Sequence, residues 1–78
     1  MCTQKQEVFM YRYYVHTSTD NHGDYEVHKE GCSHLPTILN REYLGLFSNC
    51  TQAVAQAKAK GYKTADGCYW CCQACHRS

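Results

Sequence analysis

The stretch Gly67-Cys68-Tyr69-Trp70-Cys71-Cys72-Gln73-Ala74-Cys75-His76-Arg77 holds four of the seven cysteines and one of the five histidines of this chain. Two C-x-x-C pairs follow one another in it, Cys68 with Cys71 and Cys72 with Cys75. Two sulfurs at that spacing can reach one tetrahedral ion. The stretch therefore predicts a metal centre built around the C-terminal segment.

The 78 residues predict one small domain, residues 1–78. At this size a hydrophobic core alone contributes only about 3–5 kcal/mol, so a disulfide or a metal is usually needed. The first residues include no apolar signal segment, and no apolar run is long enough to span a bilayer. We therefore expect a cytoplasmic protein. In that reducing compartment, clustered cysteines are more often metal ligands than disulfides. Residues 1–6 are expected to be disordered, with Cys2 a free thiol.

Alternating residues predict a β-hairpin in the first half of the chain. Residues 7–17, EVFMYRYYVHT, would place Phe9, Tyr11, Tyr13 and Val15 on one face of a strand. A turn at residues 20–24 and a second alternating segment at residues 25–29 complete the antiparallel pair. A third strand is expected at residues 41–47, although the glycine at position 45 weakens that pattern.

One helix is predicted after these strands. Asn49 suits its N-cap, Gln52 suits a capping box, and Gly61 suits the left-handed residue at its end. The residues at helical spacing on its inner face are small: Cys50, Ala53, Val54 and Ala57. The expected fold class is α+β, with an antiparallel sheet of two to three strands, one helix packed on it and a Cys/His cluster at the C-terminus.

A structural metal site usually takes two close pairs of ligands from distant parts of the chain. His28 with Cys32, after the hairpin, and Cys68 with Cys71, after the helix, form such pairs. We expect these four residues to bind Zn²⁺ and so to tie the hairpin to the C-terminal segment. The spacing leaves alternatives open: Cys72, Cys75 and His76 as ligands, and His34 in place of His28.

No H-E-x-x-H motif of a catalytic zinc site is present, and we expect no enzyme activity. Glu30 and Asp66 lie near the cluster in sequence, and we interpret them as solvated charges. Tyr69 and Trp70 are expected to cover the sulfurs and complete a small core rather than to stack on bases.

Eight basic and seven acidic residues give a net charge of +1. This balance provides little of the long-range attraction that non-specific nucleic-acid binders use, so a protein partner fits better than nucleic acid. Three lysines lie near the end of the predicted helix, at positions 58, 60 and 63. We interpret them as solvated cations near the C-terminal end of the helix dipole rather than as a binding patch.

Four motifs together resemble a family of short uncharacterised bacterial proteins rich in cysteine and histidine. They are Val27-His28-x3-Cys32, Tyr43-Leu44-Gly45-x-Phe47, Gly61-Tyr62 and Ala65-Asp66-Gly67-Cys68-x2-Cys71-x3-Cys75-His76. That resemblance implies no assigned activity. The order of the motifs also resembles, more loosely, the small zinc-binding modules related to the N-terminal domain of the Ada DNA-repair protein. This second resemblance implies a structural or thiol-reactive zinc and a link to nucleic acid.

The function expected from the sequence is a monomeric, non-enzymatic, zinc-stabilised binding module. An alternative from another class is a thiol-based redox or metal-handling protein in which Cys72 and Cys75 are reactive thiols beside the metal site. A nucleic-acid-binding accessory module is the second alternative, and it predicts binding that weakens steeply with salt.

Overall fold

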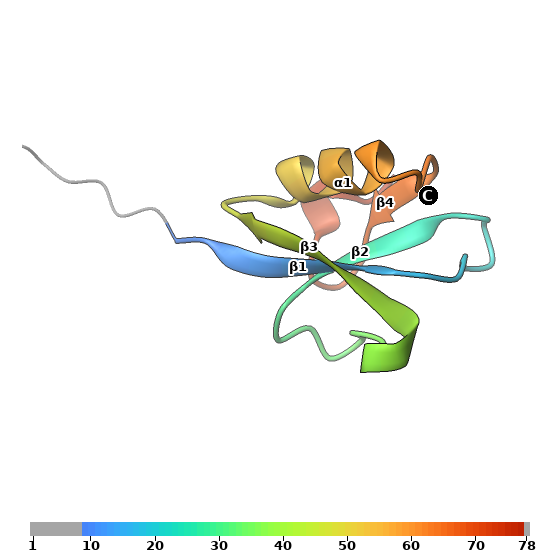
Figure 1. Cartoon of the computed structure of the whole chain (residues 1–78), viewed down its shortest axis with the longest axis horizontal. Helices are drawn as coiled ribbons and strands as arrows, with labels where there is room; N and C mark the ends of the chain where they lie inside the picture. Colours follow the sequence, from blue (N-terminus) through green and yellow to red (C-terminus); the bar gives the residue numbers. More distant parts are fainter. Residues whose placement is uncertain (1–8, 78) are drawn as a thin grey trace, which may run out of the picture.

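The structure is a computed structural model that describes residues 9–77, in which one helix packs on a four-stranded mixed sheet (Figure 1). The strands run in the order β3-β1-β2-β4. The elements are β1 (Tyr11–His16), β2 (Tyr25–Lys29), β3 (Arg41–Phe47), α1 (Cys50–Ala59), β4 (Ala65–Gly67) and two single turns of 3-10 helix, Ile38–Asn40 and Gln73–Cys75. The expected disorder of residues 1–6 and the free thiol of Cys2 fall outside the described residues.

The predicted α+β class is confirmed, but the number of strands and the purely antiparallel sheet were wrong. β4 pairs with β2 in parallel, with Val27 opposite Gly67. Three residues, Ala-Asp-Gly, are too few and too atypical of strands to give a sequence signal. They form a strand because β2 presents an open edge whose backbone groups need partners.

The predicted hairpin of β1 and β2 is present, and β3 pairs antiparallel with the other edge of β1. The register between β1 and β3 shifts between Tyr13 and Tyr14. Tyr13 lies opposite Gly45 but Tyr14 lies opposite Tyr43, so Leu44 has no direct partner in β1. Gly45 has φ 131°, a conformation that side chains disfavour. The glycine that weakened the prediction of this strand therefore marks a bulge rather than the end of the strand.

The core lies between α1 and one face of the sheet. Tyr13, Val15 and Val27 are buried on that face and pack against Ala53 and Ala57 of α1. The small helix residues let the backbone of α1 approach the sheet closely, as predicted. Phe9, assigned to the same face as Tyr13, is exposed instead and precedes the start of β1.

The predicted ends of the helix are confirmed with one difference. The Asn49 side chain accepts a hydrogen bond from the backbone N–H of Gln52, and Gly61 has φ 109°. The Gln52 side chain accepts from the backbone N–H of Ser48 rather than from that of Asn49. The capping box is thus shifted by one residue, which still satisfies a backbone donor just before the helix.

A disulfide joins Cys50, at the start of α1, to Cys75 in the C-terminal 3-10 turn. This corrects two expectations. Cys50 is buried on the helix face as predicted, but it is a half-cystine rather than a plain apolar residue. Cys75 is neither a free thiol nor an available metal ligand, because its sulfur is bonded to Cys50. Spacing along the chain could not reveal a pair separated by 25 residues.

Between residues 9 and 77, no helix has both the length and the apolar character that crossing a membrane requires.

Candidate metal centre

Two neighbouring strands bring the candidate ligands together. His28 lies in β2 next to Val27, which is in the core under α1, so its side chain points to the opposite face of the sheet. Cys32 follows on the turn after β2. Cys68 comes directly after β4, and its backbone N–H donates to the carbonyl of Val27 at 2.9 Å. Pairing of β4 with β2 therefore delivers the second ligand pair to the first.

The four residues expected to bind metal form one compact cluster. One ligand atom from each of His28, Cys32, Cys68 and Cys71 lies within 4.8 Å of all the others. Cys32 Sγ lies 3.7 Å from His28 Nδ1 and 3.9 Å from Cys68 Sγ. Two zinc–sulfur bonds of about 2.3 Å at a tetrahedral angle would place the sulfurs about 3.8 Å apart. The cluster could therefore hold a metal ion with little movement of its side chains.

The electrostatics of the cluster favour a bound cation. His28 and Cys68 are each only 1% exposed. Burial, and then the nearby His16 and His34, lower the pKa of His28 to about 4, so its imidazole is neutral and free to coordinate. Burial raises the pKa of Cys68 to about 12. Without a cation, three thiolates so close together would repel one another, and a metal ion removes that repulsion.

The other thiols of the cluster are also hard to ionise without a cation. A hydrogen bond with Cys72 and then burial raise the pKa of Cys71, and burial raises that of Cys32. The hydrogen bond with Cys71 lowers the pKa of Cys72 despite burial.

Backbone N–H groups point at three of the sulfurs. Lys29 N donates to Cys71 Sγ at 3.2 Å, His34 N to Cys32 Sγ at 3.4 Å, and Trp70 N to Cys68 Sγ at 3.4 Å. Such donors stabilise thiolate ligands and orient them. Gly67 is required just before the cluster, because a Cβ there would lie 2.6 Å from the carbonyl oxygen of Cys72.

Glu26 is a further residue of the site that the sequence analysis missed. Its Oε1 lies 3.5 Å from His28 Nε2, while His28 Nδ1 faces Cys32. His28 Nε2 is buried and makes no hydrogen bond with any described residue. Coordination through Nδ1 would leave the proton on Nε2, facing this carboxylate. The signal was present in the sequence, because Glu26 and His28 are two residues apart in a strand and so share a face.

We expect Glu26→Ala to weaken metal binding about tenfold. The carboxylate orients the imidazole and raises its basicity as a ligand, and loss of such a partner typically costs about 10–100-fold in affinity. The distance of 3.5 Å between Glu26 Oε1 and His28 Nε2 is long for a hydrogen bond, so we expect a loss at the lower end of that range. Competition with a chromophoric zinc chelator measures it. Glu42→Ala is the matched control, because that carboxylate contacts Tyr62 and Lys60 instead. Equal zinc affinity in the two variants would exclude the role of Glu26.

The alternative ligands lie outside the cluster. Cys72 is 3% exposed in the core, with its sulfur 3.6 Å from that of Cys71. Cys75 is in the disulfide. His76 Nδ1 lies 3.0 Å from the carbonyl oxygen of Gly67. His34 does not replace His28, because its ring stacks on that of Trp70.

Two other expectations near the cluster were wrong. Trp70 is 65% exposed and Tyr69 is 48% exposed, so these rings do not complete a core. They occupy the two positions between Cys68 and Cys71, where a tight turn directs side chains outward. Asp66 is buried rather than solvated. Its two carboxylate oxygens accept from the backbone N–H of Arg77 at 3.0 and 3.1 Å, which holds the end of the chain against β4.

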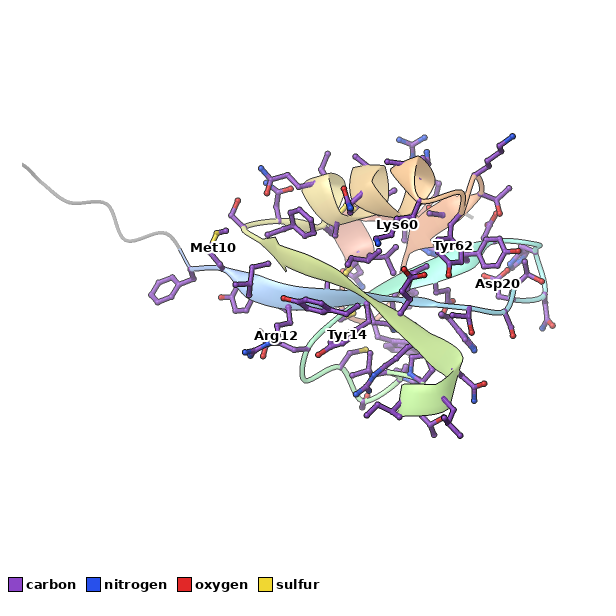
Figure 2. The ribbon with its side chains drawn as sticks, in the orientation of Figure 1. Met10, Arg12, Tyr14, Asp20, Lys60 and Tyr62 are labelled. Carbon is purple, nitrogen blue, oxygen red and sulfur yellow. A yellow bond between two sulfur atoms is a disulfide. The ribbon has the colours of Figure 1, made fainter. Side chains whose placement is uncertain are left out.

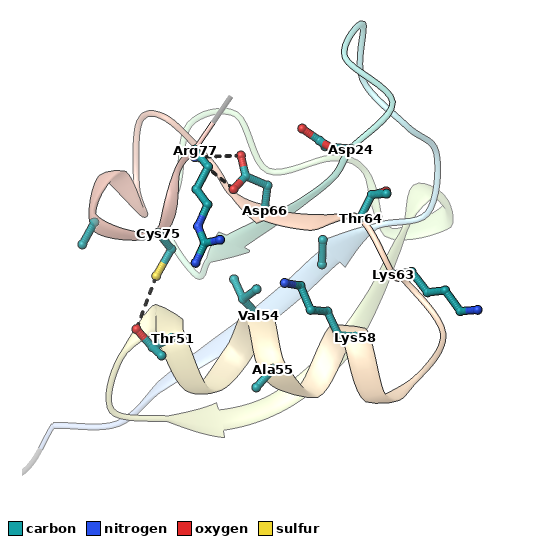
Figure 3. A pocket seen from close by; sticks show the side chains of 12 residues that line it. Asp24, Thr51, Val54, Ala55, Lys58, Lys63, Thr64, Asp66, Cys75 and Arg77 are labelled. Atoms are coloured by element: carbon teal, nitrogen blue, oxygen red, sulfur yellow. Dashed lines mark hydrogen bonds between the residues drawn. The ribbon is translucent and has the colours of Figure 1, made fainter.

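A separate hollow of about 510 Å³ lies between α1 and β4, away from the four candidate ligands (Figure 3). Its lining includes Lys58, Lys63, Asp66, Cys75 and Arg77. Figure 3 shows the disulfide-bonded Cys75 beside Thr51, with its sulfur 3.7 Å from the threonine hydroxyl. The C-terminal segment thus contributes candidate ligands on one side and is bonded to α1 on the other.

Comparison of the chain with protein-family models, with curated proteins and with solved structures found no match. The resemblance to short bacterial proteins therefore stays a prediction, and the function must be argued from the geometry.

Proposed function

We propose that the chain is a zinc-stabilised binding module without enzymatic activity. The observation that carries the proposal is the convergence of His28, Cys32, Cys68 and Cys71, whose ligand atoms all lie within 4.8 Å of one another. Three thiolates and one imidazole form a donor set that suits Zn²⁺, whereas Mg²⁺ and Ca²⁺ prefer oxygen.

A structural role fits the site better than a catalytic one. Catalytic zinc sites keep one coordination position open for water, whereas four protein ligands complete the tetrahedron. His28 and Cys68 are buried, so only Cys32 and Cys71, which are partly exposed and line a hollow of about 380 Å³, would give the ion access to solvent. Glu26, the carboxylate nearest His28, faces the nitrogen turned away from Cys32, so it is poorly placed to act on a metal-bound water.

The zinc would connect segments that are distant in the sequence. The turn after β2 and the segment after β4 are separated by about half the chain, and each contributes one ligand pair. In such a site the binding free energy becomes folding free energy. In a domain of this size, with a core of small residues in its helix, that contribution would add to the one from the Cys50–Cys75 disulfide.

The thiol-redox alternative loses its main support. It required Cys72 and Cys75 to act as a pair of accessible thiols, but Cys75 is bonded to Cys50 and Cys72 is buried. A protein of this kind that binds metal for storage or transfer would also expose its ligands, and Cys68 is enclosed. A monomeric state and a cytoplasmic location stay part of this proposal, and the Cys50–Cys75 disulfide, a crosslink that is uncommon in the cytoplasm, counts against the second.

Native mass spectrometry of the protein, before and after acid demetallation, tests the proposal. We expect one zinc per chain, and loss of the compact charge-state distribution when the zinc is removed. Substitution with Co²⁺ should give the intense absorption of a tetrahedral cobalt–thiolate centre. A folded protein that takes up neither ion would overturn the proposal.

A further inference from the structure

The face of the sheet opposite α1 carries tyrosine and arginine side chains from β1 and β3, of which Arg12 and Tyr43 are exposed and Tyr14 and Arg41 are partly buried. Tyr13 points into the core, so its neighbours Arg12 and Tyr14 point to the other face. Figure 2 shows Arg12 and Tyr14 on that side, and Lys60 and Tyr62 on the side of α1. The helix α1 does not cover this face.

Two tyrosine rings form the centre of the surface. Tyr14 and Tyr43 are opposite each other in the register of β1 and β3, and their ring centroids are 5.5 Å apart at an interplanar angle of 53°. Tyr43 is 47% exposed, while the adjacent Leu44 is buried in the core. The rings line a hollow of about 540 Å³, together with Arg12, Ile38 and Arg41. Flat aromatic surface is therefore presented to solvent on a rigid sheet.

Arginines lie on both sides of the tyrosine pair. Arg12 is opposite Leu46, two residues along β1 from Tyr14, and its side chain is 58% exposed. Arg41 lies toward the other end, with its guanidinium carbon 4.7 Å from the centroid of the Tyr14 ring. Arg41 Nη1 donates to the carbonyl of Pro36 at 3.0 Å, which holds the guanidinium in place.

The charge of this surface is positive. Among the five residues that line the hollow, two are arginines and none is acidic. Glu30 is the acidic group beside it, with a carboxylate oxygen 3.8 Å from Arg12 Nη1. Glu42 of β3 points to the other face, where it accepts a hydrogen bond from the Tyr62 hydroxyl. A ligand with negative groups on both sides of a flat ring would match this arrangement.

We propose that the surface formed by Arg12, Tyr14, Arg41 and Tyr43 binds single-stranded nucleic acid. An unpaired base would stack on the exposed Tyr43 ring, and the phosphates on its two sides would pair with the arginines. A duplex hides the faces of its bases, and an acidic peptide offers a ring for stacking only where it carries an aromatic side chain. None of these four residues is a candidate metal ligand, although Tyr14 lies opposite His28 on the same face of the sheet. The inference therefore goes beyond the proposed zinc module, and it departs from the preference for a protein partner drawn from the net charge.

Fluorescence anisotropy with a labelled single-stranded oligo(dT) of about 12 nucleotides, within the site sizes of about 4–16 nucleotides known for such surfaces, tests the proposal. We expect binding at low salt. Two phosphate contacts predict a slope of about −1.4 in log affinity against log salt, which is about a sevenfold loss between about 50 and about 200 mM salt. Arg41→Gln should weaken binding and reduce the slope by about 0.7.

Tyr43→Ala should weaken binding about tenfold or more, and Tyr43→Phe should retain it, because stacking needs the ring and not the hydroxyl. Tyr69→Ala is the matched control, since Tyr69 is 48% exposed, almost the same as Tyr43, but lies between Cys68 and Cys71. It should bind like the unsubstituted protein. Far-UV circular dichroism of each variant establishes that it is folded.

Three results would overturn the proposal: no binding of the folded protein at about 50 mM salt, a loss confined to Tyr69→Ala, or equal binding of duplex DNA and the single strand. Poly-glutamate that binds as tightly, with the same loss in Tyr43→Ala, would replace nucleic acid by an acidic peptide. The outcome is separable from the zinc proposal, because the metal content of the same samples is measured independently. A folded, zinc-free protein that still binds oligo(dT) would sink only the metal proposal.

Discussion

Cys68→Ser is expected to weaken zinc binding more than 100-fold and to unfold much of the protein at 37 °C. Zinc contributes about 10–16 kcal/mol in zinc-finger peptides, so loss of one of four ligands removes on the order of 3 kcal/mol, a more than 100-fold loss of affinity. That is comparable to the whole contribution of a core this small. Zinc content by native mass spectrometry and thermal unfolding by circular dichroism measure the two effects.

Cys72→Ser is the matched control for this experiment. Both residues are cysteines with almost no exposure, 1% for Cys68 and 3% for Cys72, and they are four positions apart. The same change of sulfur to oxygen therefore costs similar packing, but only Cys68 belongs to the four-residue cluster. Cys72→Ser should keep one zinc per chain. If the Cys72 variant lost its zinc and the Cys68 variant kept it, the assigned ligand set would be wrong.

Replacing both members of the disulfide, as Cys50→Ala with Cys75→Ala, should lower the free energy of unfolding by about 3–4.7 kcal/mol. The bond closes a loop across 25 residues, and crosslinks of about 15 to 100 residues restrict the unfolded chain by that amount. Urea denaturation at saturating zinc measures the change. The variant should still bind one zinc, because neither cysteine is in the cluster.

The unsubstituted protein treated with a strong reductant provides the control for the double variant. If the disulfide accounts for the effect, the reduced protein and the variant should unfold at the same urea concentration. An unchanged unfolding free energy in both would show that the crosslink contributes nothing. Loss of zinc in the double variant alone would instead mean that the C-terminal turn positions Cys71.

Several elements could be predicted because their signals are local. The alternation of apolar residues predicted β1 and β2, and Asn49 and Gly61 predicted both ends of α1. The ligand pairs were identifiable as well, since each pair is held by a few residues of sequence. The sequence did not show that the two pairs meet in space, and we inferred it from the usual composition of tetrahedral sites. In the structure the four side chains do lie together.

Other features could not be predicted because they depend on contacts between distant segments. β4 becomes a strand only when β2 offers it an edge, so Asp66 is buried and Gly67 is required. Tyr69 and Trp70 are exposed because the turn between two ligand cysteines faces outward. We predicted these rings to be core residues from their hydrophobicity alone. Hydrophobicity does not specify the direction in which a side chain points.

The sequence by itself determined the α+β class, the hairpin, the helix with its caps, and which cysteines and histidine stand in pairs, because these follow from periodicity, capping and spacing over a few residues. Only the tertiary structure decided which thiols become partners. It joined Cys50 to Cys75, set Cys72 in the core and gathered Cys68 and Cys71 with His28 and Cys32. The physical reason is that β4 pairs with β2 and carries the C-terminal segment to the edge of the sheet, while α1 packs on one face only. Cys71 and Cys72 are therefore directed to different sides, Cys71 to the cluster and Cys72 to the core under α1.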